Sequence, residues 1–266
     1  MNQRQESVRI PVFANGRSET IRITAPTRAG LLADLERLMA ARQGFTLATL
    51  NLDHLVKLRK DADFMAAYQA HSHIVADGNP IIWLSRLAGQ PVDLIPGSEL
   101  VQPLAALAAR TGTRVGLLGS TDEVLALTAQ RLESAHPGLN VALRHAPPFG
   151  FDPTGAAADH AINLLREQDI GLCFLALGAP KQEIFAAYAA QSVPQCGFAS
   201  VGAGLDFIAG SQVRAPKWVQ SIAMEWAWRM ASNPRRLARR YADCFAILPG
   251  LALQARRNRA AAQKET

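Results

Sequence analysis

The stretch Leu177-Gly178-Ala179-Pro180-Lys181-Gln182-Glu183 places glycine, proline and polar residues directly after the apolar run 170–177. Such a change is typical of the end of a buried parallel strand. A second stretch of this kind, Gly202-Ala203-Gly204-Leu205-Asp206-Phe207, follows the apolar run 197–201. Because ligands bind at the carboxyl ends of strands in open α/β sheets, the two stretches predict an α/β fold with a ligand site at one sheet edge.

Strand and helix patterns alternate along most of the chain. Strands are predicted at residues 45–50, 73–76, 114–118, 141–144, 170–177 and 197–201. Helices are predicted at 53–69, after Pro80, at 98–110 with Ser98 as cap, after Ser120 or Thr121, and at 155–167 and 181–191. This alternation predicts a mostly parallel, Rossmann-like sheet with helices on both faces.

The two ends of the chain differ from this pattern. Residues 8–12 and 20–23 flank Asn15-Gly16 and predict an N-terminal β-hairpin. Residues 216–232 predict a helix whose i, i+4 apolar stripe is an ordinary core signal. We expect an α/β core over residues 1–233 and a basic, membrane-associating appendage over residues 234–266.

Composition bounds the class of protein. The 266 residues are 49% hydrophobic with a mean hydropathy of +0.03, which is normal for a soluble protein with a full core. No apolar run of 18 residues predicts a transmembrane helix, and residues 1–10 contain no apolar stretch of signal-peptide length. The three cysteines are widely spaced and form no disulfide or zinc pattern. We therefore expect a cytoplasmic protein.

Basic residues concentrate near the C-terminus. From residue 214 onward there are 11 lysines and arginines and three acidic residues, a net charge of +8, so the remainder carries −2 of the total +6. The apolar segment 241–255 is broken by Pro249-Gly250, is bracketed by arginines and is too short to span a bilayer. This arrangement suits an anionic membrane surface. It also suits nucleic-acid phosphates or a solvated helix face.

Polar residues at two further strand ends are candidates for chemistry. Asp77 ends the predicted strand 73–76, and Gly78 after it would let a ligand approach the backbone. A carboxylate there can act as a general base on a hydroxyl group, although Asp-Gly is also a common turn. Thr49 and Asn51 occupy alternate positions at the end of the preceding strand and share one face. Their neutral donors and acceptors suit sugar hydroxyls.

The two stretches quoted first offer contacts for an anion. Lys181 and Gln182 open a predicted helix directly after Gly178, and helix N-termini present free N–H groups to anions. Gly202 and Gly204 allow close approach of a ligand, and Asp206 is a candidate for binding a ligand hydroxyl or for capping a turn.

Metal and cofactor patterns are weak. Asp61-Ala62-Asp63 has the D-x-D form of metal-dependent sugar-nucleotide enzymes, but it falls inside the predicted helix 53–69, where positions i and i+2 do not face each other. No third glycine completes a dinucleotide fingerprint after Gly204, and no P-loop is present. We therefore expect neither a metal nor a cofactor.

Together these motifs resemble the WecG/TagA/CpsF family of bacterial glycosyltransferases from about Thr49 to Arg240. The resemblance is carried by Thr49-Leu50-Asn51, Ala76-Asp77-Gly78, Gly97-Ser98-Glu99-Leu100, residues 178–183 and 202–206, Arg214-Ala215-Pro216, and Glu225-Trp226 with Arg229. One departure is that the family commonly has an arginine shortly before the Gly-Ser-Glu-Leu motif, whereas residues 92–97 contain none.

The resemblance implies an inverting transfer of a hexose or N-acetylhexosamine from a UDP-sugar to a polyprenyl-diphosphate-linked sugar, without an obligatory metal, in cell-wall or exopolysaccharide synthesis. It implies that Asp77 is the catalytic base. Substrate-binding positions are expected at Thr49, Asn51, Gly78, Gly178, Lys181, Gln182, Gly202, Gly204, Asp206, Arg214, Arg229, Arg235, Arg236 and Arg239. Glucose, N-acetylmannosamine and its uronic acid all fit the family as the transferred sugar.

The expected partners are a nucleotide-sugar donor, a lipid-linked acceptor and an anionic membrane surface, with no nucleic acid. The expected location is the cytoplasm, peripheral at the inner face of the bacterial cell membrane, and a homo-oligomer is left open. A nucleic-acid-binding protein using the arginine-rich tail is the alternative, and it predicts steep salt dependence of binding. A nicotinamide-dependent oxidoreductase is disfavoured by the incomplete glycine fingerprint.

Overall fold

The six apolar runs predicted as strands pair into one parallel sheet. The structure is a computed structural model that describes residues 8–14, 17–212, 216, 228 and 234–262. The strands are β3 (Phe45–Leu50), β4 (His73–Ala76), β5 (Arg114–Gly119), β6 (Asn140–His145), β7 (Leu172–Ala176) and β8 (Gly197–Ser200). Their order is β4-β3-β8-β7-β5-β6, and every neighbouring pair is parallel. The predicted α/β class is confirmed.

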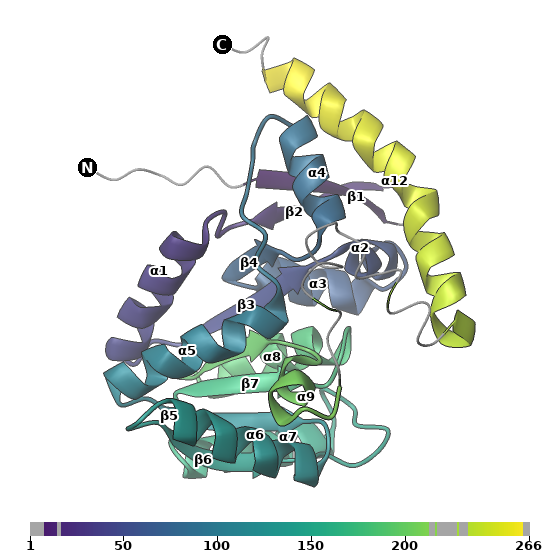
Figure 1. Cartoon of the computed structure of the whole chain (residues 1–266). Coiled ribbons are helices and arrows are strands. Elements are labelled where there is room, and N and C mark those ends of the chain that lie inside the picture. The colour runs from purple at the N-terminus through teal and green to yellow at the C-terminus, as the bar shows by residue number, and fades with distance from the viewer. Residues whose placement is uncertain (1–7, 15–16, 213–215, 217–227, 229–233, 263–266) are drawn as a thin grey trace.

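Helices cover both faces of this sheet (Figure 1). One face is covered by α1 (Arg28–Ala40), α5 (Gly97–Thr111), α6 (Asp122–Ala135) and α9 (Gly204–Ala209), which pack on Leu47, Leu117 and Phe174. The other face is covered by α7 (Ala156–Glu167) and α8 (Lys181–Ser192), and beside them by α2 (Leu52–Leu58) and α3 (Ala62–Ala70). Burial on both sides explains why most of the strands read as continuous apolar runs.

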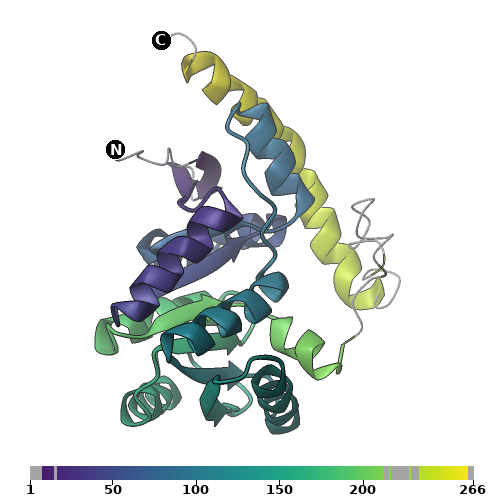
Figure 2. The same cartoon turned by 60° about the vertical axis from the view of Figure 1, so that its left-hand side comes forward.

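The N-terminal hairpin, α4 and α12 form a layer beside β3 and β4. The predicted hairpin is confirmed as β1 (Val8–Ala14) and β2 (Arg17–Ile23), with Val8 paired to Ile23. It shares a core cluster with α4 (Asn79–Leu87) and α12 (Pro234–Ala262), to which α12 contributes Cys244, Leu251 and Ala255. Figure 2 shows α12 lying along α4. The basic appendage therefore packs on the core through an apolar stripe.

At two points in the sheet, neighbouring strands are followed by helices on opposite faces. After β5, α6 lies on the first face, whereas after the neighbouring β7, α8 lies on the second. In the same way α2 follows β3 on the second face and α9 follows its neighbour β8 on the first. Such switch points open a crevice at the carboxyl ends of the strands. Both of the glycine-rich stretches quoted first lie at this edge.

Three details differ from the sequence-based expectations. The helix predicted over 53–69 is two helices, because the Asp61 carboxylate accepts the Phe64 N–H at 2.9 Å and starts a new helix there. The Asp61–Asp63 pair therefore lies at a helix start and not inside a helix. α5 begins at Gly97, with Pro96 rather than Ser98 at its cap.

The break expected at Pro249-Gly250 is also absent. α12 continues through both residues, which are exposed, while Leu251 and Ala255 beyond them are buried. Proline costs a helix one backbone hydrogen bond, and packing of the buried stripe holds the helix together across it. Within the described residues, no helix is both long and apolar enough to cross a membrane. The predicted helix 216–232 lies almost wholly outside the described residues.

Candidate functional site

Asp77 is half-buried at the carboxyl end of β4. Its backbone N–H donates to the Leu50 carbonyl at 2.8 Å, which extends the β3–β4 pairing by one residue. Gly78 follows with φ +97°, in the region that favours glycine, and α4 then begins with no side-chain cap. Asp77 is therefore not the cap of α4, and its carboxylate stays at the strand end.

Thr49 and Asn51 have different environments. Thr49 is buried, and a Cβ added at Gly97 would lie 3.2 Å from its Oγ1, so the first residue of α5 presses against the end of β3. The Asn51 side-chain oxygen accepts the His54 N–H at 3.0 Å and caps α2. This cap was not foreseen from the sequence, and it occupies one of the lone pairs that a sugar hydroxyl would use.

The loop after β7 is held by two side chains. Gly178 has φ +73°, and its N–H donates to Gln182 Oε1 at 3.2 Å. Gln182 is only 3% exposed, and its Nε2 donates to Glu183 Oε1 at 2.8 Å. Lys57 Nζ donates to the Ala179 carbonyl at 3.0 Å. The carboxamide of Gln182 is thus tied inside the protein, where it braces the loop.

Lys181 opens α8 and is half-buried. The pKa of Asp152 is lowered, mainly by hydrogen bonds from Thr154 and to a smaller extent by the positive charge of Lys181. Lys181 therefore lies in electrostatic range of the connection between β6 and α7.

The glycines after β8 serve different purposes. Gly202 has φ +53° and open space where a side chain would be. At Gly204 a Cβ would lie 3.0 Å from Val101 Cγ2 of α5, so the close approach that Gly204 allows is between two helices. Asp206 Oδ1 accepts a hydrogen bond from Ser120 Oγ at 3.2 Å, and Ser120 itself has φ +56°. This bond links the ends of the β5 and β8 segments.

A charged cleft of about 490 Å³ opens beside this edge. It is lined by four cationic, three acidic and two apolar residues: Lys57, Lys60, Arg239, Arg240, Asp53, Asp61, Asp243, Val56 and Pro180. The lining comes from α2, the start of α3, the loop before α8 and α12. Asp77 does not line the cleft. It is connected to the cleft wall through β3, because the Leu50 carbonyl accepts the Asp77 N–H and Asp53 of the lining follows Leu50 by three residues.

Two of the cations are anchored on one carboxylate. Arg240 Nε lies 2.7 Å from Asp53 Oδ1, and Lys57 Nζ lies 2.9 Å from Asp53 Oδ2. Burial raises the pKa of Asp53, but the hydrogen bond from Lys57 and the charges of Arg240 and Lys57 outweigh it, so the net shift is downward. Asp53 therefore stays ionised and holds both cations at the cleft wall, where they suit an anionic ligand such as a diphosphate.

Several of the expected binding arginines are only partly described. Arg239 lines the cleft. Arg235 and Arg236 lie in the first turn of α12, where only the backbone is described, and Arg214 and Arg229 fall outside the described residues. In the stretch 92–97, where the family's arginine is missing, Arg28 reaches in from α1, donating to the Leu94 carbonyl at 3.5 Å and to Glu99 Oε2 at 2.8 Å.

A buried polar cluster lies behind the edge, and the sequence analysis missed it. The Tyr68 hydroxyl lies 2.7 Å from His54 Nδ1, and both side chains are buried. Burial lowers the pKa of His54 to about 3 and raises the pKa of Glu183 to about 7. Burial also raises the pKa of Tyr68, and the charges of Glu183 and Asp77 raise it further. The only available signal was the position of Glu183 in the stretch 177–183.

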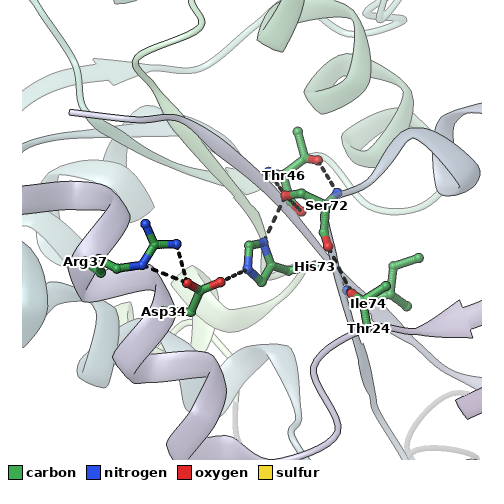
Figure 3. A network of polar contacts seen from close by, with 7 residues as sticks. All are labelled: Thr24, Asp34, Arg37, Thr46, Ser72, His73 and Ile74. Carbon is green, nitrogen blue, oxygen red and sulfur yellow. Dashed lines mark hydrogen bonds and ion pairs between the residues drawn. The ribbon is translucent and has the colours of Figure 1, made fainter. Parts of the chain in front are cut away.

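A second polar network lies at the opposite, amino edge of the sheet (Figure 3). His73 Nε2 lies 2.9 Å from Asp34 Oδ2, and its Nδ1 lies 2.9 Å from Ser72 Oγ. Ser72 Oγ accepts the Thr46 N–H at 2.9 Å and lies 3.1 Å from the Thr46 carbonyl. Although serine, histidine and aspartate line up, the hydroxyl is committed to the backbone of β3. We interpret this network as structural: it joins the start of β4 to β3 and to α1.

In the part of the chain that the structure describes, potential metal ligands are not gathered at either edge. Among the described residues, no group of three or more His, Cys, Asp or Glu side chains is placed to hold a metal ion. Of the D-x-D pair, Asp61 is the N-cap of α3 and Asp63 lies in the first turn of that helix.

Comparison with protein-family models agrees with this geometry. Residues 19–262 match the model described as "Glycosyl transferase WecG/TagA/CpsF family", which covers nearly the whole chain, from the hairpin to the end of α12. In an open α/β sheet of this kind, ligands bind at the carboxyl ends of the strands. The chain therefore belongs to the WecG/TagA/CpsF family of glycosyltransferases.

Proposed function

We propose that the protein transfers a hexose or N-acetylhexosamine from a UDP-sugar to a sugar on a polyprenyl diphosphate, with inversion, in cell-wall or exopolysaccharide synthesis. The observation that carries the proposal is that Asp77 and the cleft lined by Lys57, Lys60, Arg239 and Arg240 are connected through the end of β3, where the Leu50 carbonyl accepts the Asp77 N–H three residues before Asp53 of the lining. A carboxylate and a cationic pocket are what a base and a diphosphate each require.

In the proposed mechanism, the hydroxyl oxygen of the acceptor sugar bonds to the anomeric carbon of the donor sugar, and Asp77 accepts the proton of that hydroxyl group. The bond between that carbon and the diphosphate oxygen breaks at the same time, and UDP leaves with the bonding electron pair. A single displacement of this kind inverts the anomeric carbon. The four cations of the cleft stabilise the negative charge that develops on the diphosphate, so metal-free transfer is part of the proposal.

A panel of UDP-sugars, assayed with a short-chain polyprenyl-diphosphate sugar acceptor, tests the proposal. UDP-glucose, UDP-N-acetylmannosamine and its uronic acid form the panel, each with and without EDTA. We expect one donor to give a glycosylated lipid at the same rate in EDTA. No product from any donor would overturn the transfer itself, and loss in EDTA with recovery in manganese or magnesium would overturn only the metal-free mechanism.

We further propose that α12 brings the enzyme to an anionic membrane surface. Its exposed residues include Phe245, Leu253, Arg256 and Arg257, a mixture of apolar and cationic side chains that suits a headgroup layer. Full-length protein is expected to sediment with phosphatidylglycerol vesicles at low salt and less so as salt rises. The double variant Arg256→Glu/Arg257→Glu, which leaves the buried stripe intact, should stay in the supernatant. Equal sedimentation of both proteins would contradict membrane binding by this helix.

A further inference from the structure

Glu183 is a fully buried acidic residue for which the proposed mechanism has no role. It is 0% exposed in the first turn of α8. Its Oε1 accepts one hydrogen bond, from Gln182, while its buried Oε2 has no hydrogen-bond partner among the described residues. Burying a carboxyl group with one oxygen unsatisfied is costly. An apolar side chain of the same length would avoid that cost, and a glutamine would avoid burying a negative charge.

The hydrogen bond that Glu183 accepts is the first of a short series. Gln182 Nε2 donates to Glu183 Oε1 at 2.8 Å, and the Gly178 N–H donates to Gln182 Oε1 at 3.2 Å. On the other side of the same loop, Lys57 of the cleft donates to the Ala179 carbonyl at 3.0 Å. The loop is thus anchored inward by Glu183 through Gln182 and outward by a cation of the cleft.

Glu183 is also in electrostatic range of the proposed site. The charges of Glu183 and Asp77 both act on Tyr68, and the charge of Lys57 acts on Glu183. α3, which carries Tyr68, packs on α8, which carries Glu183. Glu183 therefore lies behind the edge formed by Asp77 and the cleft.

We propose that Glu183 is a positioning residue: it fixes the Gln182 carboxamide, which holds the Gly178 loop in place against the rim of the cleft. Its effect on turnover rests on the proposed function, whereas its effect on the loop does not. A glutamine at this position has the same shape and can still accept the hydrogen bond from Gln182. A methionine of the same length cannot.

The test compares Glu183→Gln with Glu183→Met in the full chain. The first readout is hydrogen exchange of the Gly178 amide, followed by NMR. The second is kcat/KM with the active pair from the UDP-sugar panel. Leu132→Ala, a buried change in α6, is the matched control for general loss of stability. If the methionine variant does not fold, Glu183→Ala replaces it.

We expect the Gly178 amide of Glu183→Met to exchange at least ~10-fold faster, because its partner Gln182 has lost its own anchor. We expect kcat/KM to fall roughly 10-fold, because the hydrogen bond that supports the loop is lost. Glu183→Gln should stay within about threefold of wild type in both readouts, and so should Leu132→Ala.

Unchanged exchange of Gly178 in Glu183→Met would overturn the positioning role. Equal loss in the glutamine and methionine variants would overturn it too, since it would show that shape and hydrogen bonding are not what matters. If the wild type transfers no sugar, the proposed function fails, and the exchange readout still decides the role of Glu183.

Discussion

The amino and carboxyl edges of the same six-stranded sheet use their polar residues in different ways. At the amino edge, Thr46 and Ser72 exchange hydrogen bonds between two strands, and His73 extends them to Asp34 on α1. At the carboxyl edge, the buried Glu183 and Ser200 each keep an oxygen without a hydrogen-bond partner among the described residues. Among the described residues, the amino edge also holds two buried atoms without a partner, His71 Nε2 and Arg114 Nε. What distinguishes the carboxyl edge is that its unpartnered groups lie near a charged cleft.

This difference separates stability from function. Satisfied buried hydrogen bonds each contribute roughly 1 kcal/mol to folding, whereas an unsatisfied buried group costs about 1–3 kcal/mol. The charged side chains of the cleft line an open space where a ligand can bind, whereas the network of Asp34, His73 and Ser72 is engaged within the protein. Substitutions in that network should therefore lower stability and leave transfer intact, whereas substitutions of the charged residues of the cleft should impair transfer more than stability.

The largest expected effect is that of Asp77→Asn. The asparagine keeps the size of the side chain and the backbone bond to Leu50, but it cannot accept the acceptor's proton. Transfer should fall by ~100- to 10,000-fold, with a melting temperature within roughly 2 °C of wild type. Turnover within a few-fold of wild type would show that Asp77 is not the base, and it would contradict the assignment of function to the carboxyl edge.

A pair of arginines gives the next test. Arg240 at the cleft and Arg37 at the amino edge each form an ion pair with an aspartate, at 2.7 Å and 2.6 Å. Arg240→Ala removes a cation from the proposed diphosphate site and should raise the KM for the UDP-sugar donor about 10-fold, as expected for one lost charge-assisted hydrogen bond. Arg37→Ala is the matched control and should leave the KM within about twofold, since it is an exposed pair. Equal effects of the two variants would contradict the functional assignment of the cleft.

Sequence and structure agree where local patterns decide the outcome. The apolar runs, the hairpin and the turn at Asp77-Gly78 are encoded within a few residues, so the sheet and the edge that carries the motifs were predictable. The split between α2 and α3 was not predicted, because the capping bond from Asp61 competes with a continuous helix.

The cleft was not predicted because no local pattern contains it. Lys57 and Lys60 come from the region of α2, and Arg239 and Arg240 come from α12, about 180 residues later in the chain. Only the packing of α12 on α2 and α4 brings them together. Glu183 was missed for a related reason: an acidic residue in the first turn of a helix is expected to be exposed.

Replacing Glu183 by glutamine should also change how stability depends on pH. The pKa of Glu183 is raised from 4.5 to about 7 by burial, so between these values the folded state binds the proton more tightly than the unfolded state. The free energy of unfolding therefore falls as the pH rises through this window. Glu183→Gln has no carboxyl group to ionise, so its free energy of unfolding should not fall in this window. It should melt roughly 2–6 °C above wild type at pH 8, with little difference at pH 4. A gap that does not depend on pH would contradict the buried ionisation.

The smallest effect is expected at the amino edge, from Asp34→Asn. The hydrogen bond from His73 is the main cause that lowers the pKa of Asp34, with further contributions from Arg37. A carboxylate with a lowered pKa stabilises the fold above its unfolded value of 3.8, and this stabilisation is lost as the pH falls through the folded value. Because Asp34 is partly exposed, the loss in the variant should be only about 1–2 °C at pH 7.

Calorimetry at pH 7 and pH 3 checks this, since the gap between Asp34→Asn and wild type should close at the lower pH. Asp53→Asn is the matched variant at the other edge, because Asp53 also has a lowered pKa and cationic neighbours. Asp53→Asn releases Lys57 and Arg240 and should raise the KM for the UDP-sugar donor by several-fold, on the order of one lost ion-pair hydrogen bond. Asp34→Asn should leave the KM unchanged. If Asp34→Asn impairs transfer as much as Asp53→Asn does, the two edges are coupled and the separation of stability from function does not hold.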